Sequence, residues 1–331
     1  MKVSVIIPTY NSKDTLIKCL NSLIKQNYRS KYEIIVIDDG STDKTGEAIK
    51  KNFKKSKLIR YFSQKNKGPA VARNFGAKKA KGEFILFTDA DCVPEKNWIK
   101  NITSPFKNKK VVGVSGSYGK NLNKKSIISR LIHFEILERY KKLKKQKEID
   151  FISTYSAAYR RKIFLKTKGF DESFKKPAGE DTELSFKMHK YGKLIFKPEA
   201  KVGHFHRSAL TKYIKQKSTT GFWRADLYMK HSNKIFRHSF TPLKDYFELA
   251  LLGLAFLFLI FFLISFNTVL LYVFLGFLIA SIACSLRTVL KIKGDPELAI
   301  LAPFIILIRN FFLGWGAFVG FFKKKRKLNN K

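Results

Sequence analysis

The sequence predicts an α/β fold in which a doubly wound half with parallel strands is followed by C-terminal transmembrane helices. Within the first 100 residues, short apolar runs alternate with helical segments in the order β-α-β-α-β-α-β. The runs end in polar residues, at the edge where open α/β sheets place their ligands. Residues 247–286 then carry two long apolar stretches, each near the ~20 residues that cross a bilayer.

The first predicted strand covers residues 2–8, a mostly apolar run that ends at a proline, which cannot continue a central ladder. Thr9 and Tyr10 follow at the ligand edge. Tyr10 could stack on a base, although a single tyrosine at a strand end is more often a packing residue. We expect Asn11 or Ser12 to cap a helix over about 13–26, whose leucines face inward.

The second predicted strand, residues 32–37, ends in the polar run Asp38-Asp39-Gly40-Ser41-Thr42-Asp43. This run combines carboxylates, a glycine turn and helix-capping hydroxyls. At such a strand end Asp39 can accept a hydrogen bond from a base N–H or a ribose hydroxyl. The alternative is a turn-and-cap role, which we expect for Ser41 and Asp43.

A third strand over residues 58–62 leads to a helix that Gly68-Pro69 opens, since proline is tolerated in the first helical turn. A helix N-terminus with Lys67 and Arg73 nearby suits a phosphate or an acidic base edge. Ordinary surface cations are the alternative. That alternative is weaker for Arg73, because it lies inside a tightly packing helix rich in Ala and Gly.

The fourth strand, residues 84–88, ends in two carboxylates, Asp89 and Asp91. Residues i and i+2 of an extended stretch face the same way, so both side chains can point at one divalent ion. Hard oxygen ligands suit Mg²⁺ or Mn²⁺, which commonly bridge substrate phosphates. The alternative is a solvated turn, where aspartate is common.

Later segments predict a helix over 95–106, a strand over 111–118 and a basic helix over 126–147. The basic helix either lies along a membrane surface or is simply solvated. Glu180 and Asp181 open a further helix, where an acidic first turn suits the helix dipole and could equally supply a general base.

Two short strands are predicted at 194–196 and 202–206. His204 and His206 share a face of the second strand, and one of them could complete a metal shell from a distant part of the chain. A structural pair of histidines is the equal alternative.

Composition excludes several classes of protein. The net charge is +40, but the lysines are spread over the chain and do not gather on one recognition element, so we expect no nucleic acid partner. An anionic substrate, an anionic membrane surface or a lysine-rich composition accounts for the charge equally well. The three cysteines have no paired spacing, which fits a reducing compartment, and Cys92 is interpreted as a small filler residue. The sequence contains neither a Gly-x-Gly-x-x-Gly pattern nor a P-loop pattern, which argues against a dinucleotide cofactor and against a P-loop NTPase.

Taken together, the motifs resemble those of family-2 glycosyltransferases in order and spacing, over roughly residues 2–207. They are Pro8-Thr9-Tyr10-Asn11, Asp38-Asp39-Gly40-Ser41-Thr42-Asp43, Asn66-x-Gly68-x4-Arg73-Asn74-x-Gly76, Asp89-Ala90-Asp91, Gly169-Phe170-Asp171 and Gly179-Glu180-Asp181. The resemblance implies a GT-A fold, with its Rossmann-like sheet for a nucleotide-sugar, and an inverting sugar transfer from a UDP- or GDP-linked donor.

The resemblance also implies roles for the site residues. A divalent metal, Mn²⁺ or Mg²⁺, would hold the donor pyrophosphate, and its implied ligands are Asp91, Asp89 and, in preference to His206, His204. Asp181 would be the catalytic base, with Glu180 beside it. The implied nucleotide-binding residues are Pro8, Thr9, Tyr10, Asp39, Lys67, Arg73 and Asp89.

The chain departs from processive polysaccharide synthases, which carry Gln-x-x-Arg-Trp where this chain offers only Gly221-Phe222-Trp223-Arg224. We therefore expect transfer of a single sugar to a lipid-linked acceptor, in the assembly of a glycan, a glycolipid or a protein-glycosylation precursor. One alternative is a polyprenyl (dolichyl) phosphate glycosyltransferase, and another is a non-catalytic scaffold that binds nucleotide-sugar or glycan. A phosphate monoester is already ionised near neutral pH, so a catalytic role for Asp181 favours a hydroxyl acceptor.

We expect residues 1–240 to form a cytoplasmic catalytic domain, because Met1-Lys2 leads directly into a strand pattern without a signal peptide. Residues 241–331 are predicted to form a multi-pass domain in the cell membrane, with spans at about 247–265 and 268–286.

The basic loop after the second span and the basic tail both belong in the cytoplasm by the positive-inside rule, which two spans satisfy. Residues 298–322 contain Pro303 and the polar pair Arg309-Asn310, which is costly in lipid. We therefore expect this third run to be interfacial or re-entrant.

Overall fold

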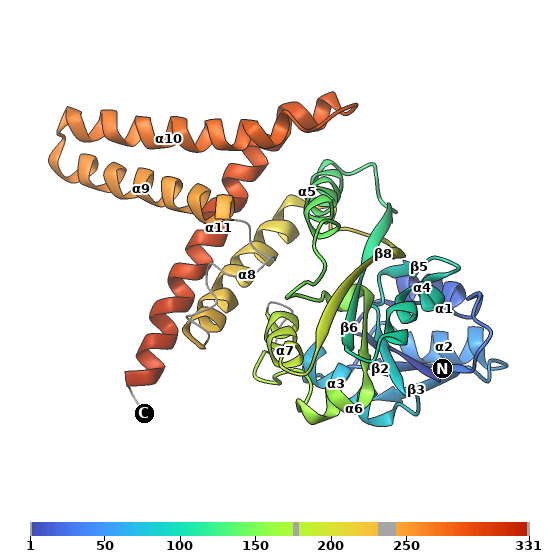
Figure 1. The fold of residues 1–331 in the computed structure, drawn as a ribbon. Coiled ribbons are helices and arrows are strands. Elements are labelled where there is room, and N and C mark those ends of the chain that lie inside the picture. The colour runs from blue at the N-terminus through green and yellow to red at the C-terminus, as the bar shows by residue number, and fades with distance from the viewer. Residues whose placement is uncertain (1, 175–178, 231–242, 330–331) are drawn as a thin grey trace. The chain divides into compact units, whose positions relative to one another are not determined.

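The computed structural model describes residues 2–174, 179–230 and 243–329 (Figure 1). They divide into two compact units, one of residues 1–123 and 135–206 and the other of residues 124–134 and 207–331. Helix α5 (Ile127–Leu143) begins in the second unit and ends in the first. The predicted domain boundary at residue 240 lies outside the described residues.

The first unit is built on an eight-stranded sheet in the order β3-β2-β1-β4-β7-β6-β8-β5. Its first four strands pair in parallel, which confirms the predicted doubly wound half. These strands are β1 (Val3–Thr9), β2 (Tyr32–Asp38), β3 (Ile59–Ser63) and β4 (Phe84–Phe87). Their carboxyl ends therefore meet at one edge of the sheet.

The other half of the sheet is mixed. Strand β7 (Ala157–Arg160) runs antiparallel to both β4 and β6 (Val111–Asn121), and β5 (Cys92–Pro94) runs antiparallel to β8 (Lys193–His204). Strands β6 and β8 are parallel.

Strand β8 corrects the prediction of two short strands at 194–196 and 202–206, because it is continuous from Lys193 to His204. Pro198 does not end it. The register of β6 against β8 shifts between Ser115 and Ser117, and the carbonyl of Pro198 accepts a hydrogen bond from Ser117 Oγ at 2.8 Å. The proline thus lies at an irregularity of the ladder, where no regular donor is required of it.

Helices cover both faces of the sheet (Figure 1). The apolar residues of α1, α2 and α4 pack in one core with Val5 and Ile7, and those of α3, α6 and α7 pack in the other with Ile6. Alternate residues of β1 thus face opposite cores, as the period of a strand requires. The helices are α1 (Lys13–Leu23), α2 (Thr45–Phe53), α3 (Pro69–Lys79), α4 (Trp98–Thr103), α6 (Arg161–Lys166) and α7 (Glu180–His189), with short 3₁₀ turns at Ser104–Lys107 and Thr154–Ser156.

Ser12 is the N-cap residue of α1, as predicted, but neither its side chain nor that of Asn11 caps the helix. Ser12 Oγ donates to the carbonyl of Tyr10, and Asn11 Oδ1 accepts from the backbone N–H of Thr42. The first turn of α1 instead donates from the N–H of Lys13 to the Asp43 carboxylate at 3.0 Å. A carboxylate from the loop after β2 therefore satisfies this helix end.

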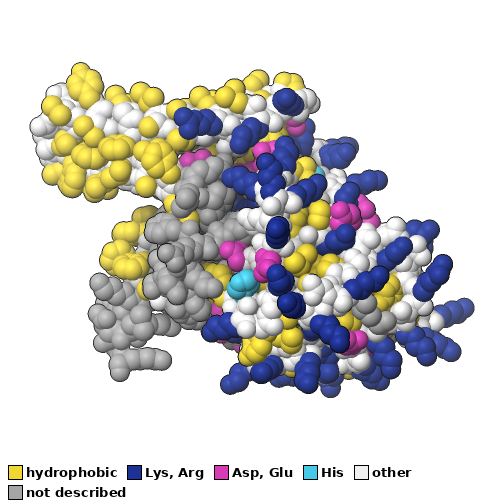
Figure 2. Space-filling model, in the orientation of Figure 1, with side chains coloured by type: hydrophobic (Ala, Val, Ile, Leu, Met, Phe, Trp, Pro, Cys, Tyr) yellow, Lys and Arg dark blue, Asp and Glu magenta, His cyan; other side chains and the backbone are white. Residues whose placement is uncertain are grey.

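The second unit holds α8 (Leu210–Lys230), α9 (Leu243–Ser265), α10 (Thr268–Val289) and α11 (Pro296–Asn329). Among the described residues, three helical segments are long and apolar enough to span a membrane by length and composition: 246–265, 268–289 and 296–323. Hydrophobic side chains cover much of the visible surface of α9 and α10 (Figure 2), which is consistent with membrane anchoring.

Helix α11 is continuous through Pro303, and its polar pair has a partner in the same unit. The carboxylate of Glu248 on α9 accepts from Asn310 Nδ2 at 3.0 Å and lies 3.5 Å from a guanidinium nitrogen of Arg309. Glu248 and Asn310 are each 3% exposed. Pairing of this kind reduces the cost of Arg309 in lipid. The interfacial or re-entrant position of residues 298–322 stays a prediction.

Helices α8 and α11 approach each other through glycines. A Cβ at Gly316 would clash with the carbonyl oxygen of Ser218, and one at Gly320 would clash with that of Phe222. Gly221 of α8 meets the backbone of α11 in the same way. The spacing of Gly316 and Gly320 is the small-residue pattern through which membrane helices pack closely.

Candidate active site

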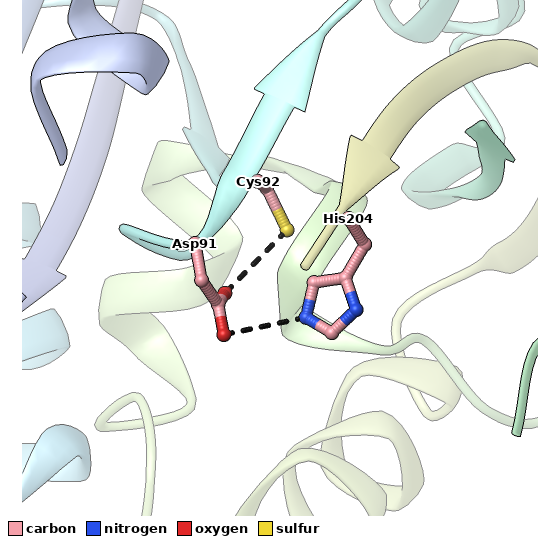
Figure 3. Close-up of side chains that lie close together, drawn as sticks. All are labelled: Asp91, Cys92 and His204. Atoms are coloured by element: carbon pink, nitrogen blue, oxygen red, sulfur yellow. Dashed lines mark hydrogen bonds and ion pairs between the residues drawn. The ribbon is translucent and has the colours of Figure 1, made fainter. Parts of the chain in front are cut away.

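The carboxyl end of β4 and the end of β8 bring Asp91 and His204 together. Strand β5 begins directly after Asp91, and Cys92 pairs in register with His204. The backbone N–H of Phe205 also donates to the carbonyl of Asp91. As a result, His204 Nε2 lies 3.3 Å from Asp91 Oδ2, with both side chains directed toward each other (Figure 3).

Cys92 is the third member of this cluster, and its sulfur lies 3.9 Å from Asp91 Oδ1 (Figure 3). Burial raises the pKa of the Cys92 thiol well above its ordinary value, and the nearby Asp91 carboxylate adds to the rise. Without a metal the thiol is therefore protonated at neutral pH, and sulfur is a soft ligand that hard ions such as Mg²⁺ and Mn²⁺ do not prefer. Asp91 and His204 are the members of the cluster with a donor chemistry that suits a metal.

His206 lies behind His204 as seen from Asp91. The two Nδ1 atoms are 2.7 Å apart, and His206 is buried. The ring of Tyr118 packs against both imidazoles, with centroid distances of 4.6 Å to His204 and 5.1 Å to His206. Tyr118 is itself stacked on Tyr155 at 3.7 Å.

Arg73 links the end of β4 to the start of α7. One guanidinium nitrogen lies 2.9 Å from Asp89 Oδ1, and another lies 3.0 Å from Glu180 Oε1. The side chains of Arg73 and Glu180 are only 4% and 3% exposed, whereas that of Asp89 is 31% exposed. The two carboxylate motifs, far apart in the sequence, are thus joined through one cation.

Asp181 differs from its neighbour Glu180. Glu180 is buried, bonded to Arg73 and to the N–H of Gly179, while Asp181 is half-buried. Removal from water raises the pKa of Asp181 to about 8, the Glu180 carboxylate adds to the rise and Arg73 opposes it. A carboxylate with a pKa near the working pH suits a general base.

Asp39 is occupied by the loop before α3. Its carboxylate accepts hydrogen bonds from Gln64 Nε2 at 2.7 Å and from the backbone N–H groups of Lys67 and Gly68 at 2.9 and 2.8 Å. Asp38 accepts from the hydroxyl of Tyr61 at 2.8 Å. In this structure both carboxylates organise the loops around the carboxyl ends of β2 and β3.

The remaining predicted nucleotide-binding residues differ in exposure. Tyr10 is 50% exposed and Lys67 is exposed, so both side chains are accessible to a ligand. Pro8 is half-buried in β1, and Thr9 is buried.

Sequence reasoning did not identify Tyr118 and Tyr155 as part of this site. Tyr118 lies in β6 and Tyr155 in the 3₁₀ turn before β7, and no local motif marks either of them. The antiparallel insertion of β7 beside β4 brings Tyr155 there, since the hydroxyl of Thr88 donates to the carbonyl of Tyr155 at 2.9 Å.

Comparison with known proteins gives a consistent picture. The family model described as Glycosyl transferase family 2 matches residues 4–167. A dolichyl N-acetyl-alpha-D-glucosaminyl phosphate 3-beta-D-2,3-diacetamido-2,3-dideoxy-beta-D-glucuronosyltransferase of Methanococcus voltae is 27% identical over 334 residues, 97% of each chain. An uncharacterized glycosyltransferase of Rickettsia felis is 50% identical over 90 residues, which are 27% of this chain and only 15% of that protein.

Two solved structures share the fold. The mannosyltransferase PcManGT from Pyrobaculum calidifontis, in complex with GDP-Man and Mn²⁺, superposes with a TM-score of 0.61 at 21% identity, over 97% of this chain and 87% of that one. The S. aureus TarS fragment 1–349, in complex with UDP-GlcNAc, gives a TM-score of 0.52 at 18% identity, over 96% and 90%. These likenesses confirm the predicted GT-A fold.

Proposed function

Because the chain belongs to glycosyl transferase family 2, we propose that it transfers a sugar, with inversion, from a UDP- or GDP-linked donor to a lipid-linked acceptor. The observation that carries this proposal is the bridge of Arg73 between Asp89 and Glu180. It joins the carboxylates at the end of β4 to the acidic start of α7. A donor site and a general base are thereby assigned to one edge of the sheet.

We propose Asp91 and His204 as ligands of a divalent metal, Mn²⁺ or Mg²⁺, with Asp89 beside them. A carboxylate oxygen and an imidazole nitrogen converge there, and carboxylate oxygens suit both ions. The Mn²⁺ bound by the Pyrobaculum mannosyltransferase supports the assignment. When bound, such an ion neutralises charge on the departing nucleoside diphosphate.

Asp181 is the proposed base. Its deprotonated carboxylate takes the proton of an acceptor hydroxyl while the oxygen attacks the anomeric carbon of the donor. Glu180 is too buried to reach an acceptor, and its pairing with Arg73 fixes the first turn of α7. Glu180 therefore positions the base.

We assign the roles of the other nucleotide-binding residues from the exposure of their side chains. Tyr10 and Lys67 are assigned to direct contact with the nucleotide, because their side chains are exposed near the carboxyl ends of β1 and β3. Pro8, Thr9 and Asp39 are assigned to shaping the pocket, because they are partly or fully buried.

The acceptor is proposed to be lipid-linked, in the assembly of a glycan, a glycolipid or a protein-glycosylation precursor. Three apolar helices consistent with membrane anchoring support this, as does the dolichyl-linked acceptor in the name of the Methanococcus relative. The catalytic unit is assigned to the cytoplasmic side of the cell membrane. Labelling of single cysteines introduced at Lys291 and Lys323 tests this topology, since both are expected to react only from the cytoplasm.

The function is tested by incubating the purified full chain with native lipid extract and a panel of labelled UDP- and GDP-sugars, in Mn²⁺, Mg²⁺ or EDTA. We expect one donor to be consumed with metal and its sugar to appear in a lipid product. Transfer to polyprenyl phosphate itself would favour the polyprenyl phosphate glycosyltransferase. Metal-dependent nucleotide binding without turnover of any donor would favour the non-catalytic scaffold.

A further inference from the structure

The imidazole of His206 is buried directly behind the proposed metal ligand His204, with the two Nδ1 atoms 2.7 Å apart. We propose that His206 is a positioning residue, which holds His204 in the tautomer and orientation whose Nε2 lone pair faces the metal. This inference rests on the proposed function, because it concerns the metal of that site.

The orientation of His204 depends on which of the two rings carries the hydrogen that lies between them. At 2.7 Å only one hydrogen lies between the two Nδ1 atoms, so one ring donates and the other accepts. If His204 donates from Nδ1, its neutral ring leaves the lone pair on Nε2, the atom 3.3 Å from Asp91. His206 then accepts at Nδ1 and carries its own proton on Nε2.

The opposite placement suits the site without an ion. There His206 donates, and His204 carries a proton on Nε2 that it can share with Asp91. With a metal in place, the Nε2 proton of His204 would be lost to Asp91 or solvent and the hydrogen between the rings would belong to His204. His206 would take up a proton at Nε2, so both rings would stay neutral. The same contact between the two histidines is thus compatible with the site with and without a metal ion.

The surroundings of His206 keep it in place. Its backbone carbonyl accepts a hydrogen bond from Asn123 Nδ2, and Tyr118 meets its ring edge-on at 5.1 Å. Tyr118 is fixed in turn by its stacking on Tyr155 and by a hydrogen bond from its N–H to the hydroxyl of Tyr140 at 2.9 Å. Such outer-shell partners fix the tautomer of a metal-bound histidine and raise metal affinity.

The test is Mn²⁺ binding to the full chain, followed by electron paramagnetic resonance in the presence of UDP or GDP. His206→Leu removes the acceptor for the His204 proton, and we expect Mn²⁺ to bind about 10–100-fold more weakly. His206→Asn keeps an acceptor oxygen near the position of Nδ1, so it should recover most of the affinity. In both variants, nucleotide affinity measured in EDTA should equal that of the wild type.

A second readout reports the ligand itself. Nitrogen hyperfine coupling to bound Mn²⁺ is expected in the wild type, should vanish in His204→Ala and should weaken in His206→Leu. Equal Mn²⁺ affinity and equal coupling in wild type and His206→Leu would overturn the role of His206 alone. A wild type that binds no Mn²⁺ would overturn the metal site and this inference with it. Should His206→Leu not fold, His206→Met takes its place in the same comparison.

Discussion

The guanidinium of Arg73 lies 3.0 Å from the carboxylate of Glu180, although 107 positions separate the two residues in the chain. Both side chains are almost fully buried. The same guanidinium also holds Asp89, so the strand that ends in the Asp-Ala-Asp motif and the helix that carries Asp181 are held by one cation. We expect Arg73 to act mainly through these two carboxylates.

Removal of Arg73 should therefore destabilise the first unit. Arg73→Met leaves Glu180 buried without a cation, and breaking a buried pair in this way costs about 3–5 kcal/mol of unfolding free energy. Denaturant unfolding measures the loss. Arg73→Met combined with Glu180→Gln should be clearly more stable than Arg73→Met alone, because the uncompensated charge is gone. Additive losses from the two substitutions would contradict the pairing.

Asp181→Asn should lower the transfer rate by about 10²–10⁴-fold, the usual contribution of a general base. Glu183→Gln, on the same helix and paired with Lys187, is the matched control and should retain most activity. A rate near that of the wild type for Asp181→Asn on a hydroxyl acceptor would exclude the assigned base. Unreduced activity of this variant on polyprenyl phosphate would show that the acceptor needs no base.

The pH dependence of kcat/KM should report the ionisation of the Asp181 carboxyl. The pKa of Asp181 is raised to about 8, so its carboxyl is largely protonated at pH 7 and deprotonated at pH 9. Because the base acts in its deprotonated form, kcat/KM should rise with pH until it levels off above about 8. This rising limb should disappear from the residual activity of Asp181→Asn. A profile that falls from pH 6 to 9 would contradict the assignment.

Asp91→Asn should weaken Mn²⁺ binding at least as much as loss of an outer-shell partner does, about 10–100-fold. Cys92→Ala is the control, because its buried thiol is protonated and we expect it to contribute no ligand. Isothermal titration of Mn²⁺ in the presence of nucleotide measures both variants. Loss of affinity in Cys92→Ala with retention in Asp91→Asn would reverse the assignment of ligands within this cluster.

The glycine contact between α8 and α11 gives a prediction for the second unit. Gly316→Leu should lower the melting temperature of the detergent-solubilised protein, because its side chain would collide with the backbone of Ser218. Gly276→Leu on α10 is the matched control, since among the described residues a Cβ built there would meet nothing within 4 Å apart from its chain neighbours and its own helix backbone. Equal melting temperatures for the two variants would contradict the close packing.

The parallel half of the sheet could be predicted from the sequence, because each strand is a short apolar run with a polar end and each connection is a helix. The edge on which Asp39, Asp89 and Asp91 lie follows from that pattern. The continuity of β8 could not be predicted, since Pro198 signals a break and the shift of register that accommodates it depends on β6.

The contacts between distant parts of the chain could not be predicted either, because local sequence patterns do not show which elements pack together. The capping of α1 by Asp43, the bridge from Arg73 to Glu180 and the pairing of Glu248 with Asn310 each depend on how the elements pack. The contact between His206 and His204 is a further example. Strand periodicity predicted that the two side chains share a face, but their contact depends on how the chain turns after β8. The residue types indicated which side chains could bind a ligand, whereas the packing of the elements determines which groups each side chain contacts.

The proposed function is metal-dependent transfer of a sugar from a nucleotide to a lipid-linked hydroxyl, with Asp181 as base. It is tested most directly by measuring nucleoside diphosphate release and labelled lipid product in the same reaction, for wild type and Asp181→Asn. We predict equal amounts of both products in the wild type with Mn²⁺ or Mg²⁺, neither product in EDTA, and both products strongly reduced in Asp181→Asn. Nucleotide release without any labelled lipid, or equal product from the two proteins, would contradict the claim.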